Sequence, residues 1–229
     1  MKKPSKKNLT LIIIAAITML GIIVLLFSKL HAADNIDRIN ESLNGAYDLE
    51  IIEIGKYSGP YVEDGTNIEV DNILMLKVKN NGKEPIQYGE IVLLGKDVED
   101  AVFKFSTLNP NQTIAVIESE KKLYKESKKY DSAIATRVAY FQTEPKLHDD
   151  KLEIQPLDGG LNITNISDKD INGDIMIYFK NYKEEQLLGG ITYRGRIEGG
   201  LKAGEIRQIM SSNFTKDNTK VMFITIDGK

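Results

Sequence analysis

Cysteine and tryptophan are absent from the 229 residues, and histidine occurs only twice, at His31 and His148. Without a thiol the chain can form no disulfide, so each folded unit must be stabilised by an apolar core. Zinc sites built from Cys and His ligands are excluded for the same reason. A nucleophile–histidine pair would need one of two imidazoles that lie in connecting segments rather than on a rigid scaffold. We therefore predict that the protein is not an enzyme and binds no cofactor.

An excess of positive charge is also lacking, since the formal net charge is −3. Four lysines stand within the first seven residues, so the rest of the chain is more acidic than this value. They are Lys2, Lys3, Lys6 and Lys7. A net acidic chain argues against nucleic acid as a partner.

One long stretch has no charge at all; it begins at Leu9 and ends at Phe27. As a helix it would measure about 28 Å, close to the hydrocarbon thickness of a bilayer. We predict a transmembrane helix over residues 9–28 that anchors the chain in the lipid bilayer. The lysines before it favour a cytoplasmic N-terminus and extracellular C-terminal domains. A cleaved signal peptide is the alternative, but Leu30 and His31 fit poorly before a cleavage site.

From Tyr47 onwards, short segments with alternating apolar residues are separated by Gly, Asn, Asp and Pro. This pattern is typical of antiparallel strands in a sandwich or barrel. The predicted organisation is a cytoplasmic tail (1–8), the transmembrane helix (9–28), a juxtamembrane helical stalk (29–46), one β-sandwich domain (47–144), a linker (145–150) and a second β-sandwich domain (151–229).

The two predicted domains share a sequence pattern. A strand ends at Asn80 in the first and at Asn165 in the second, and each has an Ile six residues later. Further on, the segment 108–112 of the first domain matches 201–205 of the second. Offsets that differ between the matches are expected when loops gain residues, so we predict two copies of one sandwich.

This pattern of a strand-end Asn, a polar turn and a later Leu-containing turn resembles FxLYD-like immunoglobulin-type domains of bacterial surface proteins. The resemblance implies an extracytoplasmic, non-enzymatic setting. The predicted fold class is therefore mainly β, with one N-terminal transmembrane helix followed by two tandem antiparallel immunoglobulin-like β-sandwich domains.

One loop has the spacing of a calcium site. Its oxygen-bearing residues alternate along the chain, at Asp168, Asp170, Asn172 and Asp174. The position where a bidentate Glu belongs is Phe179, and ordinary turn chemistry explains the same residues. A calcium site is therefore the weaker of the two interpretations.

Arginine is concentrated near the end of the chain. On a strand, Thr192, Arg194 and Arg196 would share one face, and Arg207 follows shortly after. Arginine makes planar contacts that are favoured at interfaces. We predict that these four residues bind a partner protein, the alternative being the solvated face of an ordinary sheet.

Three other features allow an ordinary reading. The carboxylates of Glu118 and Glu120 are interpreted as a solvated strand end, and the lysine-rich insert 118–130 as a solvated helix. The glycine-rich stretch 199–205 lacks the Lys-Ser/Thr of a phosphate-binding loop and is interpreted as a strand connection.

The function predicted from the sequence is a membrane-anchored extracytoplasmic adaptor, or a subunit of a cell-envelope complex, that binds a partner protein through its β-sandwich domains. The alternative is a surface module that binds envelope polymer or calcium.

Overall fold

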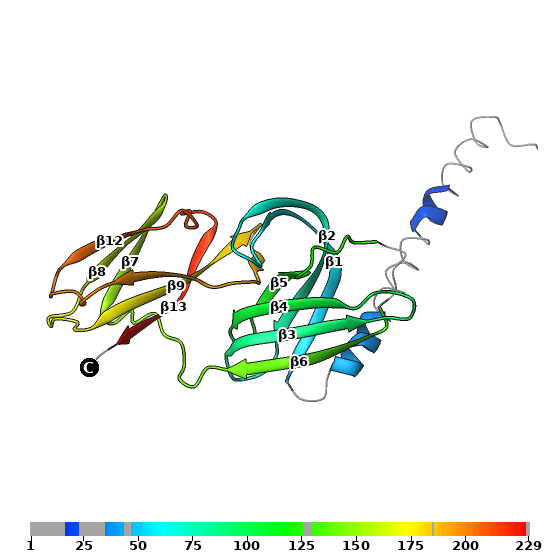
Figure 1. Ribbon diagram of the computed structural model, residues 1–229, viewed down its shortest axis with the longest axis horizontal. Helices are drawn as coiled ribbons and strands as arrows, with labels where there is room; N and C mark the ends of the chain where they lie inside the picture. Colours follow the sequence, from blue (N-terminus) through cyan, green and yellow to red (C-terminus); the bar gives the residue numbers. More distant parts are fainter. Residues whose placement is uncertain (1–16, 23–34, 44–46, 126–129, 185, 228–229) are drawn as a thin grey trace, which may run out of the picture.

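The computed structural model describes residues 17–22, 35–43, 47–125, 130–184 and 186–227, and the fold is mainly β (Figure 1). Its strands form two halves that lie side by side along the long axis (Figure 1). The first half comprises residues 47–140 and the second half residues 152–227.

The first half has six strands in two sheets. They are β1 (Leu49–Tyr61), β2 (Ile68–Asn80), β3 (Ile86–Leu94), β4 (Ala101–Leu108), β5 (Thr113–Ile117) and β6 (Ser132–Tyr140). One sheet has the order β1-β2-β5 and the other β4-β3-β6. Alternation dictates the inner faces: Leu74, Leu76 and Val78 of β2 are buried in the same core.

The second half repeats this arrangement. Its strands are β7 (Leu152–Leu157), β8 (Gly160–Asn165), β9 (Asp174–Lys183), β11 (Tyr193–Ile197), β12 (Ile206–Met210) and β13 (Thr219–Asp227). One sheet has the order β7-β8-β12, and β11 and β13 flank β9 in the other. Strand for strand this is the order of the first half.

One strand has no counterpart in the first half. β10 (Gln186–Leu188) follows β9, pairs antiparallel with it and pairs in parallel with β5. A sheet therefore runs from the first half into the second. The pairing between β10 and β5 also corrects the expectation of purely antiparallel sandwiches.

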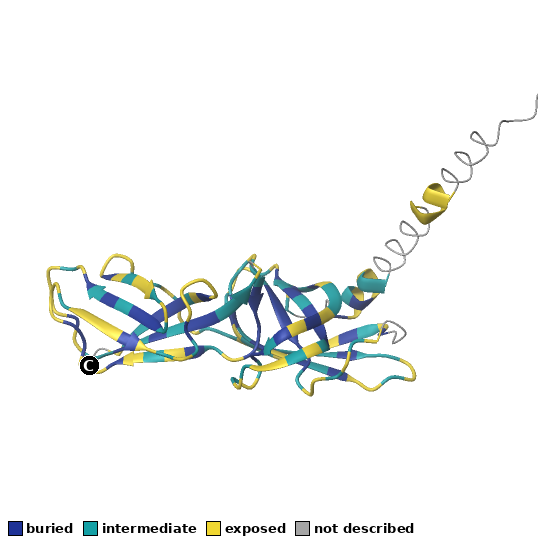
Figure 2. Cartoon of the chain, turned by 90° about the horizontal axis from the view of Figure 1, so that it is seen from above, coloured by how far each residue is buried: buried dark blue, intermediate teal, exposed yellow. Residues whose placement is uncertain are grey.

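Each half has its own apolar core, and buried stretches line the strands of both (Figure 2). The first-half core also takes in three second-half residues, Leu187, Met222 and Phe223. A further cluster on the outer face of β5 combines Ala115 and Ile117 with Leu188 of β10. The halves are therefore joined by shared apolar packing in addition to the linker.

A helix over residues 35–43 covers the first half. Ile39 and Leu43 are buried in its core. The Asn40 side chain makes two hydrogen bonds to the main chain of Ile51. Asn40 Nδ2 donates to the Ile51 carbonyl at 2.9 Å, and the Ile51 amide donates to Asn40 Oδ1 at 2.8 Å. This part of the predicted stalk is thus a helix docked on β1.

The predicted transmembrane helix is not found. Within the described residues no helix is both long and apolar enough to cross a membrane. Of the predicted span 9–28 the structure describes only residues 17–22, which are helical. The remainder of that span lies outside the described residues, as do Lys2, Lys3, Lys6 and Lys7. The fold class is therefore corrected to mainly β, with no membrane-spanning helix among the residues that the structure describes, and the extracellular location stays a prediction.

The segment 57–60 contains Gly59 and Pro60, which usually interrupt a strand, yet it lies inside β1, whose register is irregular there. One local prediction is also wrong. The described part of the insert 118–130 contains turns and isolated bridges instead of a helix, because its main chain bonds to β2 and to the Glu118 side chain.

Candidate functional site

The junction between the two halves contains a fully buried lysine. Lys180 lies near the end of β9, and its side-chain ammonium donates to three main-chain carbonyl oxygens of one segment. The distances are 3.0 Å to Gly189, 3.0 Å to Gly190 and 3.4 Å to Ile191. Burial lowers the pKa of the Lys180 ammonium from its ordinary value, and the charge of Glu63 opposes that effect.

Glu63 is the acidic group that faces this lysine across the junction. It lies in the loop between β1 and β2, and its Oε1 accepts a hydrogen bond of 2.9 Å from the main-chain amide of Ile117. Its Oε2 is buried and has no hydrogen-bond partner among the described residues. Burial raises the pKa of the Glu63 carboxyl, while the Ile117 amide and the Lys180 charge act in the opposite direction. An acidic and a basic group thus interact electrostatically across the junction, while burial disfavours the charged form of each.

Residues 186–192, which we call the joining segment, hold the lysine in place. Hydroxyl groups bind the joining segment to β4. Ser106 Oγ donates to the Gly190 carbonyl at 2.6 Å, and Thr192 Oγ1 lies 2.9 Å from Ser106 Oγ and 3.0 Å from Thr107 Oγ1. Gly190 has a φ of +65°, and a Cβ there would lie 2.8 Å from the Glu63 Cα. Only glycine allows the joining segment to approach the Glu63 loop so closely.

A groove of about 430 Å³ opens beside this junction. Its lining includes Glu63, Lys104 and Ser106 together with aromatic side chains from both halves. Tyr178 and Phe223 stack with their ring centroids 4.3 Å apart, and Phe141 meets Phe223 edge to face at 5.1 Å. The groove thus combines an acidic group, a basic group, a hydroxyl and an apolar wall.

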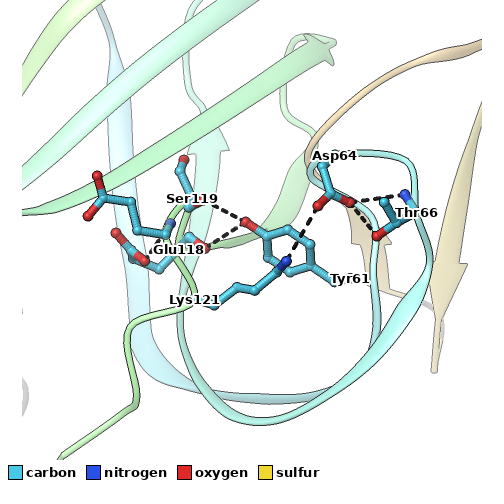
Figure 3. A network of polar contacts seen from close by, with 7 residues as sticks. Tyr61, Asp64, Thr66, Glu118, Ser119 and Lys121 are labelled. Atoms are coloured by element: carbon cyan, nitrogen blue, oxygen red, sulfur yellow. Dashed lines mark hydrogen bonds and ion pairs between the residues drawn. The ribbon is translucent and has the colours of Figure 1, made fainter.

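The tip of the β1–β2 hairpin is fixed by the network in Figure 3. Tyr61 Oη donates to the carbonyls of Glu118 and Ser119, at 3.1 and 2.8 Å. The Lys121 ammonium lies 4.4 Å from the Tyr61 ring centroid and 3.5 Å from Asp64 Oδ2. Burial raises the pKa of Tyr61, which keeps the hydroxyl protonated as a donor.

Glu118 corrects the prediction of a solvated strand end. The residue is fully buried, and three main-chain amides donate to its carboxylate, those of Val102, Glu120 and Lys122. These bonds fold the chain after β5 into a turn. The Glu118 carboxylate therefore has a structural role, accepting main-chain hydrogen bonds, and this does not support the reading of Glu118 and Glu120 as paired catalytic carboxylates.

The four predicted partner-binding residues do not form one face. Arg194 and Arg196 are exposed on β11 while Tyr193 and Ile197 are buried, so the predicted alternation holds there. Thr192 precedes the strand and is turned to the first half, because Gly190 interrupts the extended chain. Arg207 lies on β12 and bonds to Glu205 at 2.8 Å and to the Glu198 carbonyl at 2.9 Å.

The oxygen ligands predicted for calcium point to other partners. Asp174 bonds to Arg196 and accepts the Gly199 amide, and Asp170 accepts the Ala203 amide. Hydrogen bonds from the Gly199 amide and the Arg196 side chain hold the pKa of Asp174 below its ordinary value. Among the residues that the structure describes, no three His, Cys, Asp or Glu side chains converge as a metal site would require. Asp168 and Asn172 belong to the same turn.

Sequence reasoning missed Glu63 and Lys180. The only signal at Lys180 is its place directly after the buried alternation of Ile175, Ile177 and Phe179, on the face that alternation assigns to solvent. Glu63 carries no signal, because its burial results from a segment that lies far along the chain.

No protein-family model matches the chain, and neither does any curated protein. A solved structure, the C-terminal globular domain of an oligosaccharyltransferase from Pyrococcus abyssi, is similar over 78% of this chain and 45% of that chain. The identity is 15% and the TM-score 0.20. The chain thus spans less than half of that structure, and so weak a likeness carries no argument here.

Proposed function

We propose that this protein is a non-enzymatic binding protein, an adaptor or complex subunit that presents two sandwiches in a fixed orientation to a partner protein. The observation that carries the proposal is the junction: β10 belongs to the sheets of both halves, and Lys180 is bonded to three carbonyls of the joining segment. A junction with so many bonds suits a rigid platform more than a pair of hinged modules.

The use of the buried polar groups supports the same function. Glu118, Asn80, Asn165 and Lys180 are each bonded to several main-chain groups. Catalytic groups are instead directed at a space that a substrate can enter. Among the described residues three buried side-chain atoms have no hydrogen-bond partner, Glu63 Oε2, Asn109 Oδ1 and Ser119 Oγ. Of these three residues Glu63 is the exception that lines the groove beside the junction.

This exception favours a second candidate function, the binding of a small hydroxyl-bearing ligand such as a fragment of envelope polymer in the groove. Such a ligand could donate to Glu63 and pack on Tyr178 and Phe223. A rise in melting temperature with millimolar oligosaccharide, abolished in Glu63→Gln, would support it. Millimolar calcium serves as the parallel test of the metal alternative.

The test of the main proposal is crosslinking of the full chain in intact cells, followed by mass spectrometry. We expect one protein to be recovered reproducibly, with crosslinks from the second half. Recovery of no protein above an unrelated β-sandwich control would contradict the proposal. An extracellular location is part of the proposal as well, and added protease should then remove a C-terminal tag from whole cells after wall removal.

A further inference from the structure

The first half of the molecule shows how one side of this sandwich is closed. Its edge strands β4 and β5 are bridged by the joining segment. Leu187 and Leu188 lie beside Ile114 and Ala115 of β5 in parallel. Two residues later, Gly190 forms a bridge with Phe105 of β4.

Main-chain groups at the outer edge of β5 have partners in the joining segment and in Glu63. The Thr113 carbonyl accepts from Gln186 Nε2 at 3.1 Å, and the Ala115 carbonyl accepts the Gly189 amide at 2.6 Å. The next edge-facing group, the Ile117 amide, donates to Glu63. Three alternate residues of β5 therefore all direct main-chain groups away from β2 and find partners.

The strand equivalent to β5 in the second half is β12, and the register is the same. Val78 pairs with Ile114 in the first half, and Ile163 pairs with Arg207 in the second. The main-chain amide of Asn80 donates to the Gln112 carbonyl, and that of Asn165 donates to the Glu205 carbonyl. Main-chain groups of alternate residues point to opposite edges of a strand. The main-chain groups of Ile206, Gln208 and Met210 therefore point away from β8. In the first half, the main-chain groups of Thr113, Ala115 and Ile117 point away from β2 in the same way.

In the second half this edge carries exposed apolar side chains. Ile206 is 62% and Met210 67% exposed, and no strand of the described residues pairs with β12 on that side. The neighbouring strand β11 contributes the exposed Arg194.

We propose that the free edge of β12 is a docking site for an extended segment of a partner protein, which adds in parallel as the joining segment adds to β5. The proposal rests on the partner-binding function proposed above and names the surface and the chemistry of the partner. Strand addition of this kind takes its affinity from main-chain bonds and its specificity from side chains.

The side chains of β12 define the segment that fits. In the first half, Leu187 lies opposite the buried Ile114; the equivalent position opposite β12 faces Arg207, so it suits an Asp or Glu. Glu205 and the Glu198 carbonyl hold the Arg207 guanidinium in place at this edge. The following residue lies between Ile206 and Met210 and suits an apolar side chain. A second copy is a poor occupant, because its own Leu187 and Leu188 are buried, at 6% and 3% exposure.

The experiment uses the full chain and a synthetic peptide, Gln-Glu-Leu-Gly-Gly-Ile-Thr, which is the joining segment with Leu187→Glu. Saturating peptide should slow amide hydrogen exchange by about tenfold at Gln208, the counterpart of Ala115, and less at the neighbouring Ile206 and Met210. Gln208→Pro removes an edge-facing amide and should abolish the effect, while the matched Gln208→Ala retains it. A peptide with Lys in place of the Glu should protect these amides less.

Protection is measured only in variants whose melting temperature and circular dichroism match the parent chain. If Gln208→Pro fails this check, the exposed pair Ile206→Lys and Met210→Lys replaces it. Unchanged exchange at all three amides overturns the proposal, and so does protection that grows with protein concentration without peptide, which would identify a second copy. A partner that crosslinks equally to Gln208→Pro would also overturn it while leaving the proposed function standing. Failure to recover any partner would contradict that function.

Discussion

Asn80 and Asn165 occupy the same place in the two halves and make the same hydrogen bonds. Asn80 Nδ2 donates to the carbonyls of Glu84 and Leu108, at 2.9 and 3.1 Å. Asn165 Nδ2 donates to those of Lys169 and Leu201, at 2.8 and 3.1 Å. In both, Oδ1 accepts the amide two residues later. Each side chain therefore holds the end of a strand to two turns.

Replacing either asparagine by alanine should destabilise the protein. The substitution leaves one buried carbonyl, one part-buried carbonyl and one part-buried amide without their partner, which costs about 3 kcal/mol. Urea denaturation of Asn80→Ala and Asn165→Ala measures the loss. Asn162→Ala, on the outer face of β8, is the matched control and should change the free energy of unfolding by less than about 0.5 kcal/mol. Equal effects at all three positions would contradict the structural role.

Leu187→Ala should weaken the first half although the residue belongs to the second. Its side chain is buried in the first-half core, so its truncation leaves a cavity there that costs about 2–4 kcal/mol. Amide exchange should accelerate in β5 and β2 as well as in β10. Leu123→Ala is the control, because Leu123 is 52% exposed. Acceleration limited to the second half would show that the halves are energetically separate.

The buried pair predicts a pH dependence of stability. Because burial raises the pKa of Glu63, the folded chain keeps a proton that the unfolded chain releases above the ordinary value of 4.5. This contribution is fully present below pH 4.5 and is lost as the pH rises through the raised value, with a slope of at most about 1.4 kcal/mol per pH unit. Lys180 acts oppositely at higher pH: its lowered pKa makes stability rise with pH up to its ordinary value of 10.5.

Glu63→Gln should therefore remove the decline of stability above pH 4.5 and can reverse it, since Lys180 loses its counter-charge. Urea denaturation at several pH values measures the slope. Glu153→Gln, an exposed carboxylate on β7, is the control and should keep the slope of the parent chain. An unchanged slope in Glu63→Gln would show that Glu63 titrates normally.

The strands were predictable because they carry strong alternation. From Leu49 to Asp227 the chain forms strands in the region where the sequence shows this alternation. Turns with Asn, Gly and Asp separate them because those residues adopt the required backbone conformations. The repeat was predictable as well, since Asn80 and Asn165 have a local function that repeats with the fold.

The junction was not predictable from local patterns. β10 has three residues followed by Gly189 and Gly190, a sequence that indicates a turn, and only the edge of β5 gives it a partner. Lys180 stands on the face that alternation assigns to solvent, and the joining segment buries it. Glu118 was misread for the same reason, because one of its amide donors, Val102, lies on β4 while the other two belong to the turn that follows β5. Long-range contacts of this kind leave no periodic signal in the sequence.

The exposed arginines of β11 give the last prediction. Arg196 bonds to Asp174 and lies 3.3 Å from Glu198, whereas Arg194 makes no ion pair with any described residue. Exposed ion pairs are screened by water and salt, so the double change Arg194→Ala and Arg196→Ala should leave the melting temperature nearly unchanged. Because arginine contacts are energetically prominent at interfaces, we expect the double variant to recover at least tenfold less partner in the crosslinking experiment. Lys216→Ala with Lys220→Ala, two exposed lysines near β13, should leave recovery unchanged. Full recovery by the arginine variant, with the melting temperature retained, would exclude these arginines from the contact surface and leave the β12 edge to be tested on its own.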